Sequence, residues 1–138
     1  MKYYAVIDTN VLVSAMLKWN SAPGNIMELA FDHVINPIYN EEIFAEYQNV
    51  LSRPKFKFPV NVIDDFLNAI RNVGVQIESE PLNMDLPDPK DTVFYEVTME
   101  KRKTEEAYLI TGNMKHFPSV PFIVTPREML EIIANAIE

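Results

Sequence analysis

The stretch from residue 3 to residue 17 constrains the fold more than any other part of the chain. Residues 3–7 form a short apolar run that ends at Asp8, and a helical pattern of apolar side chains follows at once over residues 10–17. The run predicts a buried strand, and the pattern predicts a helix that packs against it. Open α/β sheets build their sites where such strands end, so Asp8 is the first candidate site residue.

The rest of the chain repeats this alternation of apolar runs and helical patterns. We expect further strands at residues 34–38, 75–77, 108–111 and 121–124, and further helices that start near residues 21, 40, 62, 89 and 125. Strands that alternate with helices predict an α/β fold with a mainly parallel sheet that is covered on both faces. No repeat, low-complexity tract or linker interrupts the pattern, so residues 1–138 are predicted to form a single domain.

Several predicted helices carry signals at their ends. Asn40 is a predicted N-cap, and Thr125 is another, with a proline after it and Glu128 in the position that completes a capping box. Gly74 follows the helix predicted over residues 62–73, and it suits the left-handed position that commonly ends a helix. These signals define where three predicted helices begin or end.

The composition excludes several kinds of chemistry. The chain has 138 residues, of which 48% are hydrophobic, and this suits a folded domain with a sizeable core. It contains no cysteine, which excludes disulfides, thiolate zinc sites and a cysteine nucleophile. No segment approaches the roughly 20 apolar residues of a membrane span, and no signal-peptide pattern opens the chain. We therefore expect a soluble, cytoplasmic protein without membrane contact.

The net charge bears on nucleic-acid binding. It is −8, which is not typical of a protein that binds nucleic acid, because phosphates need positive charge nearby. Clustered carboxylates can, however, hold divalent cations whose charge reverses the local field. The acidity therefore lowers the expectation of nucleic-acid binding without excluding it.

Acidic and amide side chains fall where the predicted topology brings segments to one edge of the sheet. Asp8 follows the first strand, Asn113 follows the fourth, and Asp88 and Asp91 flank the start of a helix. Glu46 lies inside the third predicted helix, near the edge of its apolar stripe. Each also has an ordinary interpretation: an N-cap for Asp8 and Asp88, a solvent-exposed acid for Glu46, a turn residue for Asn113. Asp91 would be the third helical residue, where an acid suits the helix dipole but cannot cap.

Together these side chains would make an oxygen-rich site. Crowded carboxylates repel one another, so such a cluster is unfavourable unless a cation or protons neutralise it. Hard oxygen ligands suit Mg²⁺ or Mn²⁺. The chemistry that fits is metal-assisted hydrolysis of a phosphodiester, in which the metal lowers the pKa of a bound water and stabilises the developing charge.

Basic side chains that could contact phosphates lie in three places. Arg53, Lys55 and Lys57 alternate with two phenylalanines in a loop over residues 52–59, which could grip phosphates and stack a base or be a plain exposed connector. Lys90 and Lys115 stand next to the candidate acids in sequence. The basic run at residues 101–103 is surrounded by glutamates, and we interpret it as a solvated helix end.

The order and spacing of the acidic motifs resemble the PIN domain, the ribonuclease fold of the toxin half of many prokaryotic toxin–antitoxin pairs. The matching motifs are Asp8-Thr9-Asn10 after the first strand, Glu46 in a later helix, Asp91 with Asp88 beside it, and Thr111-Gly112-Asn113 after the fourth strand. The subgroup with the greatest similarity is the toxin component that carries Leu-Ser-Arg-Pro, here residues 51–54, and Leu-Pro-Asp-Pro-x-Asp, here residues 86–91. The resemblance spans almost the whole chain.

The resemblance implies a three-layer α/β/α fold with strand order 3-2-1-4-5 and the activity of a metal-dependent endoribonuclease. It implies that Asp8, Glu46 and Asp91 are the catalytic residues and ligands of Mg²⁺ or Mn²⁺, with Asp88 and Asn113 as further ligands. The residues expected to bind the substrate are Asn10, Arg53, Lys90, Thr111, Lys115 and His116. The implied partners are RNA, a cognate antitoxin protein and a second copy of the chain in a homodimer.

The last motif departs from the family pattern. Many relatives carry an acid either at the place of Asn113 or three residues later, where this chain has His116. Asparagine offers a neutral oxygen, and histidine offers a nitrogen that suits Mg²⁺ poorly, so the site has one negative charge fewer. This favours an alternative function, a catalytically weakened PIN-fold module that binds RNA or a partner protein. His116 could instead contact phosphate or transfer a proton near neutral pH.

A third function would be a phosphatase that uses Asp8 as its nucleophile. That chemistry generally needs an acid two residues later to protonate the leaving group, and Asn10 cannot do this. We therefore rank the phosphatase below the other two functions.

Overall fold

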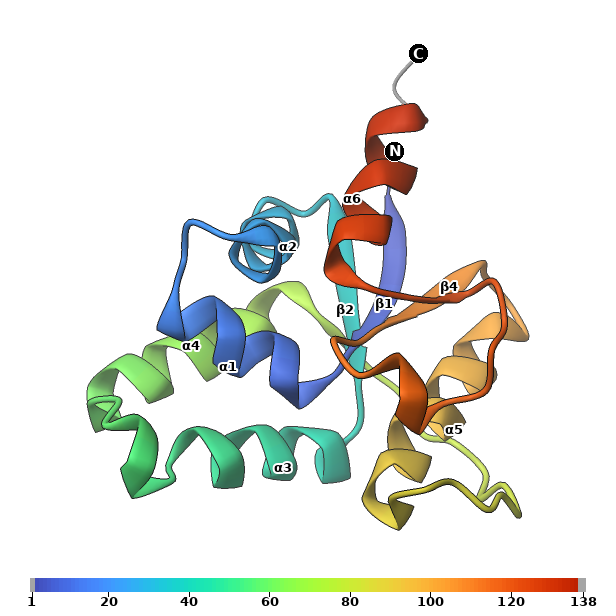
Figure 1. Ribbon diagram of the computed structural model, residues 1–138, viewed down its shortest axis with the longest axis horizontal. Coiled ribbons are helices and arrows are strands. Elements are labelled where there is room, and N and C mark those ends of the chain that lie inside the picture. Colours follow the sequence, from blue (N-terminus) through green and yellow to red (C-terminus); the bar gives the residue numbers. More distant parts are fainter. Residues whose placement is uncertain (1, 137–138) are drawn as a thin grey trace.

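The computed structural model describes residues 2–136, which form a five-stranded sheet with helices on both faces (Figure 1). The strands are β1 (Tyr3–Ile7), β2 (Ile35–Tyr39), β3 (Val75–Gln76), β4 (Ala107–Ile110) and β5 (Ile123–Val124). Every neighbouring pair is parallel, and the order across the sheet is β3-β2-β1-β4-β5. The predicted α/β/α class and strand order are therefore confirmed.

The direction of the strand crossovers explains why both faces are covered. The helices in residues 2–136 are α1 (Thr9–Leu17), α2 (Ala22–Phe31), α3 (Glu41–Leu51), α4 (Val60–Val73), α5 (Thr92–Arg102) and α6 (Pro126–Asn135). The chain advances from β1 through β2 to β3 in one direction and then returns past β1 to β4. Because parallel crossovers are right-handed, the helices before β3 cover one face and α5 covers the other. Accordingly α5 contacts β1, β2 and β4, whereas α2 and α4 contact β2 (Figure 1).

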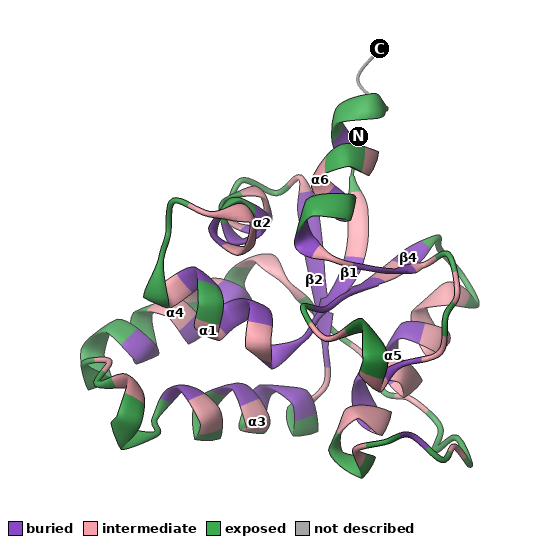
Figure 2. Cartoon of the chain, in the orientation of Figure 1, coloured by how far each residue is buried: buried purple, intermediate pink, exposed green. Residues whose placement is uncertain are grey.

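The central strand is buried on both faces. Ala5, Val6 and Ile7 are consecutive, so their side chains alternate between the two faces, yet all three are buried. A strand of this kind has to be a continuous apolar run, which is the pattern that predicted it. Figure 2 shows buried residues along the strands and on the inward sides of the helices, with exposed residues on the outward sides. No helix in residues 2–136 is both long enough and apolar enough to cross a lipid bilayer.

Two helix starts are capped as the sequence predicts. The side-chain oxygen of Asn40 accepts a hydrogen bond from the amide of Ile43 at 2.8 Å, at the start of α3. At the start of α6, Thr125 and Glu128 each accept from the other's backbone amide, which is the predicted capping box. Both helices therefore begin with their first amides satisfied by side chains.

Gly74 does not take the conformation that the sequence predicts. It ends α4 with φ −90° and ψ 174°, which is extended backbone and not the left-handed position. Glycine is needed there for space, because a Cβ atom would lie 2.8 Å from the carbonyl oxygens of Ile70 and Pro37. The sequence therefore predicts correctly that the helix ends at Gly74, but the reason is lack of space for a side chain and not a left-handed conformation.

The start of α5 differs from the prediction in a way that matters for the site. The helix predicted to begin at Pro89 is a 3₁₀ turn, Pro89–Asp91, and the α-helix begins only at Thr92. The turn closes because the side chain of Asp88 accepts from the amide of Lys90 at 3.0 Å, a local bond that competes with helix geometry. Asp91 therefore stands at the N-cap position of α5 and not at its third residue.

Candidate active site

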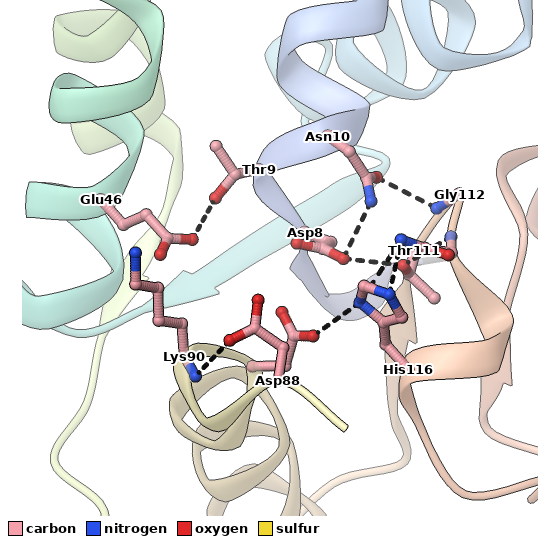
Figure 3. Close-up of polar contacts among 11 residues, drawn as sticks. Asp8, Thr9, Asn10, Glu46, Asp88, Lys90, Thr111, Gly112 and His116 are labelled. Carbon is pink, nitrogen blue, oxygen red and sulfur yellow. Dashed lines mark hydrogen bonds and ion pairs between the residues drawn. The ribbon is translucent and has the colours of Figure 1, made fainter. Parts of the chain in front are cut away.

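The carboxyl ends of β1 and β4 lie side by side, and a polar residue follows each strand. The amide of Asp8 donates to the carbonyl oxygen of Ile110 at 2.9 Å, which continues the pairing of the two strands. The hydroxyl of Thr111 donates to the Asp8 carboxylate, with 2.7 Å between Oγ1 and Oδ2 (Figure 3). Thr111 is fully buried and Asp8 is only 6% exposed. Asp8 is therefore held in one orientation at the edge of the sheet.

Asp8 occupies the N-cap position of α1, but its side chain does not cap the helix. Its Oδ2 accepts instead from Thr111 and, at 3.2 Å, from the side-chain amide of Asn10. The side-chain oxygen of Asn10 accepts in turn from the amide of Gly112 at 3.1 Å. Asn10 thus ties the start of α1 to the loop after β4, and the N-cap interpretation of the Asp8 side chain is wrong.

Glu46 reaches the same edge from α3. The hydroxyl of Thr9 donates to Glu46 with 2.8 Å between Oγ1 and Oε2 (Figure 3). Thr9 is buried and directly follows Asp8, so this bond brings the acid of α3 toward the end of β1. Glu46 is half-buried, which sets it apart from an ordinary solvent-exposed glutamate. Sequence reasoning missed Thr9, and its place between two candidate residues is the signal that could have found it.

Asp88 and Asp91 enter from the turn before α5. The side chain of Asp88 makes the predicted capping bond with the amide of Lys90, and Figure 3 shows Asp88 below Asp8. Asp91 makes no capping bond, although it stands at the N-cap position. Its Oδ2 lies 2.9 Å from Nδ1 of His116. Asp91 therefore faces the loop after β4 and not the amides of its own helix.

The loop after β4 brings Asn113 and His116 to this edge. The backbone amide of Asn113 donates to the hydroxyl of Thr111 at 3.0 Å, so this hydroxyl orders the loop as well as Asp8. The side-chain nitrogen of Asn113 lies 3.2 and 3.3 Å from the two ring nitrogens of His116. The two residues that depart from the family pattern therefore contact each other, and His116 also contacts Asp91.

The carboxylates are close enough to repel one another. Burial raises the pKa of Asp8 from its ordinary value of 3.8 to about 6, against the hydrogen bond from Thr111, and the carboxylates of Asp91 and Glu46 add to the rise. Burial also raises the pKa of Asp91, against its hydrogen bond with the histidine. Such a site favours whatever brings positive charge to it, either a proton or a cation.

The donor atoms at this edge suit a divalent cation. Among residues 2–136, no group of three acidic or histidine side chains lies close enough together to hold a metal ion without movement. The chemistry of the donors nevertheless fits, because carboxylate oxygens are the ligands that Mg²⁺ and Mn²⁺ prefer. Burial and the nearby carboxylates, which raise the pKa of Asp8, would also favour a cation beside it. The residues present are therefore compatible with the predicted Mg²⁺ or Mn²⁺.

The predicted basic–aromatic loop lies beyond the end of α3. Arg53 is exposed and follows Glu46 by seven positions, which is roughly 10 Å along a helix axis. The rings of Phe56 and Phe58 stack with centroids 5.6 Å apart and planes 13° apart. The ammonium of Lys55 lies 5.1 Å from the centre of the Phe56 ring. The loop therefore combines exposed positive charge with a flat aromatic surface just beyond the helix that carries Glu46.

The other basic residues divide into two groups. Lys90 and Lys115 are exposed and adjoin site residues in the chain. Within the run at residues 101–103, Arg102 donates to the carbonyl oxygen of Ala107 at 2.6 Å. Our interpretation of this run as a solvated helix end is therefore wrong for Arg102, because its guanidinium closes the turn between α5 and β4.

Comparison with known proteins agrees with this geometry. The family model described as "PIN domain" matches residues 4–115, which include all four candidate acids and Asn113. The chain is also similar to uncharacterized protein MJ1680 of Methanocaldococcus jannaschii, with 31% identity over 116 residues that cover 82% of this chain and 72% of that protein. PIN domains are in general nucleases, they typically use divalent metals, and they bind nucleic acid. The chain belongs to the PIN-domain family.

Proposed function

We propose that the protein is a metal-dependent endoribonuclease, which hydrolyses RNA phosphodiester bonds as the toxin of a toxin–antitoxin pair. The observation that carries this proposal is the approach of three acids from the end of β1, from α3 and from the start of α5, where burial raises the pKa of Asp8 and the carboxylates of Asp91 and Glu46 add to the rise. Asp8, Glu46 and Asp91 would hold Mg²⁺ or Mn²⁺. Asp88 and Asn113 would assist directly or through water.

The chain's own residues hold the acids in place. Thr111 and Asn10 hold the carboxylate of Asp8, and Thr9 holds that of Glu46. When bound, the cation would lower the pKa of a water molecule and stabilise the charge that develops on the phosphate. Thr111 is fully buried, so we assign it to positioning Asp8 in place of the predicted contact with the substrate.

The exposed basic residues support RNA as the substrate. Lys90 adjoins Asp91 in the chain and Lys115 adjoins His116, and both would contact the phosphates on either side of the scissile bond, with His116 as a further phosphate contact. Arg53 would contact a phosphate farther along the strand, where the stacked rings of Phe56 and Phe58 offer a surface for an unpaired base. This arrangement favours single-stranded RNA, because its bases are free to stack on side chains.

An apolar cavity supports the predicted antitoxin partner. Its volume is about 560 Å³, and its apolar lining includes Met16, Trp19, Phe31, Phe58, Val62 and Phe66. Trp19 is 40% exposed and Val62 is 42% exposed, so large apolar side chains meet solvent there. Asp65 lines the same cavity, and Glu28 accepts from the indole N–H of Trp19 at 2.7 Å. We assign the cavity to an antitoxin segment with apolar anchors and flanking basic residues, and we keep the homodimer as a second expected assembly.

One observation favours the alternative of a binding module without catalysis. His116 lies 2.9 Å from an oxygen of Asp91 that the metal would need, and the neutral Asn113 stands where many relatives have an acid. Such a module would bind RNA or a protein partner through the same surface. It would show no turnover at any metal concentration.

RNA cleavage by the purified, antitoxin-free protein tests the proposal. A mixed RNA pool is incubated with EDTA, Mg²⁺ or Mn²⁺, with Asp8→Asn beside the wild type and Asp64→Asn as the matched control, since Asp64 is exposed on α4. We expect metal-dependent cuts from the wild type and the control, and none from Asp8→Asn. Folded wild-type protein that binds RNA but makes no cuts with any metal would support the binding module instead.

A further inference from the structure

Tyr47 lies where the three acid-bearing segments meet. It follows Glu46 in α3, and its hydroxyl donates to the carbonyl oxygen of Ile7 at 2.5 Å, one residue before Asp8. Its ring centroid lies 6.4 Å from that of Phe94, in the first turn of α5 after Asp91. One side chain therefore contacts β1, α3 and α5 at positions next to their acids.

The Ile7 carbonyl needs such a donor because the ladder on the β2 side of β1 stops before it, although β1 stays paired with β4 through Ile7. The paired register of β1 with β2 runs from Tyr3 to Ala5, and it ends two residues short of Ile7. A buried carbonyl beyond the ladder is unfavourable unless another group donates to it. The Tyr47 hydroxyl is the group that does so, from a side chain that is only 2% exposed.

The hydroxyl of Tyr47 ties α3 to β1 through a bond that is buried from solvent. The bond from Thr9 to Glu46 is a second tie between the same two segments, but it lies at the half-buried edge.

We infer that Tyr47 is a positioning residue for the metal site, because its hydroxyl fixes the end of β1 against α3 and so sets the separation of Asp8 and Glu46. The inference rests on the proposed function, since it concerns the geometry in which those acids would hold a cation. Without a metal ion the carboxylates repel one another, and the buried hydrogen bond from Tyr47 to Ile7 opposes their separation. Tyr47 itself touches neither substrate nor metal.

The substitution Tyr47→Phe tests this, because it removes the hydroxyl and keeps the ring that packs against Phe94. We expect Mn²⁺ affinity, measured on folded protein by electron paramagnetic resonance titration, to fall about tenfold, as is usual when a group that orients a ligand is lost. We also expect kcat for RNA cleavage to fall while KM is unchanged. Thr98→Val is the matched control, because it removes another buried hydroxyl-to-carbonyl bond, from Thr98 to Phe94 at 2.7 Å inside α5. The control should lose stability and keep wild-type Mn²⁺ affinity.

The outcomes separate this inference from the proposed function. Mn²⁺ binding that is lost in Asp8→Asn and unchanged in Tyr47→Phe would overturn the positioning role and leave the metal site intact. Wild-type protein that does not bind Mn²⁺ would overturn the proposed function first. If Tyr47→Phe does not fold in buffer, the titration is repeated in sucrose, which favours the folded state, and wild-type Mn²⁺ affinity there would equally contradict the inference.

Discussion

The starts of α1 and α5 differ from the starts of α3 and α6. Asn40 and Thr125 stand at the N-cap positions of α3 and α6, and their side chains accept hydrogen bonds from backbone amides of those helices. Asp8 and Asp91 stand at the N-cap positions of α1 and α5, and neither side chain makes a capping bond. All four are residue types that are suited to capping.

Under the proposed function, the difference separates residues that stabilise the fold from residues that are held for chemistry. The two capping side chains satisfy amides of their own helices. The two aspartates turn away from their helices toward Thr111 and His116, at an edge where the carboxylates repel one another. We therefore propose that a good capping residue that does not cap, such as Asp8 or Asp91, marks a functional position in this fold.

The largest expected effect follows from Asp8→Asn. It should lower metal-dependent RNA cleavage on the order of 10³-fold or more, because a metal ligand and its charge are lost while the hydrogen bond from Thr111 can remain. Initial rates on a labelled RNA measure this, with Asp64→Asn as the matched control. Cleavage by Asp8→Asn at the wild-type rate would contradict the contrast between the two kinds of helix start.

The second effect is a pH dependence of stability in metal-free protein. Asp8 titrates near 3.8 in the unfolded chain and at about 6 in the folded protein. Between these pH values the folded protein holds a proton that the unfolded chain has released. The contribution of Asp8 protonation to the free energy of unfolding is therefore full below pH 3.8, and it is lost as the pH rises through 6. The difference of about two pKa units corresponds to roughly 3 kcal/mol.

Urea unfolding in EDTA between pH 4 and pH 8 measures this contribution. Other groups titrate as well, so the quantity to compare is the difference between wild type and Asp8→Asn. We expect Asp8→Asn to gain relative stability as the pH rises through 6, because asparagine carries no charge to bury. If the free energies of unfolding of the two proteins changed with pH in the same way, the pKa of Asp8 would not be raised in the folded protein.

A third, smaller effect is stabilisation by the cation. Mn²⁺ at roughly a hundred times its dissociation constant should raise the free energy of unfolding of the wild type by about 2.7 kcal/mol at pH 7.5. The gain should shrink below pH 6, where protons compete for Asp8. Urea midpoints with and without Mn²⁺ measure it, and an equal gain in Asp8→Asn would place the cation elsewhere.

The smallest expected effect comes from the capped helix start. Thr125→Ala removes half of the capping box of α6 and should lower the free energy of unfolding by about 1 kcal/mol. Metal affinity and RNA cleavage should not change, because α6 carries none of the site residues. Thermal melts measure the loss of stability, and the cleavage assay measures activity. A loss of cleavage in the folded variant would contradict the distinction between capped helix starts and those that carry site residues.

Local pattern was enough to predict the elements that depend on near neighbours. The apolar run before Asp8 gave β1, and the spacing of Thr125 and Glu128 gave the capping box, because both features are decided within a few residues. Gly74 was placed correctly for the wrong reason, since its close neighbours Pro37 and Tyr39 belong to another strand. A sequence pattern does not show such packing.

The candidate site was predictable as a set of residues but not as a set of contacts. Asp8 and Asn113 could be assigned to one edge because both follow strands of a parallel sheet. The bond between Asp91 and His116 joins residues that are 25 positions apart, through a turn whose 3₁₀ form was not expected. The role of Tyr47 could not be predicted, because helical spacing places it on the buried side of α3 but does not show which group its hydroxyl contacts.

The central claim is that Asp8 and Asp91 are held for a cation and not for their helices. The most direct measurement is anomalous X-ray diffraction from crystals of the protein equilibrated with Mn²⁺. We expect a Mn²⁺ peak within coordination distance of carboxylate oxygens of Asp8 and Asp91, with Glu46 close by, and no such peak in crystals of Asp8→Asn. A saturated wild-type crystal with no peak at this edge, or with its only peak elsewhere, would contradict the claim.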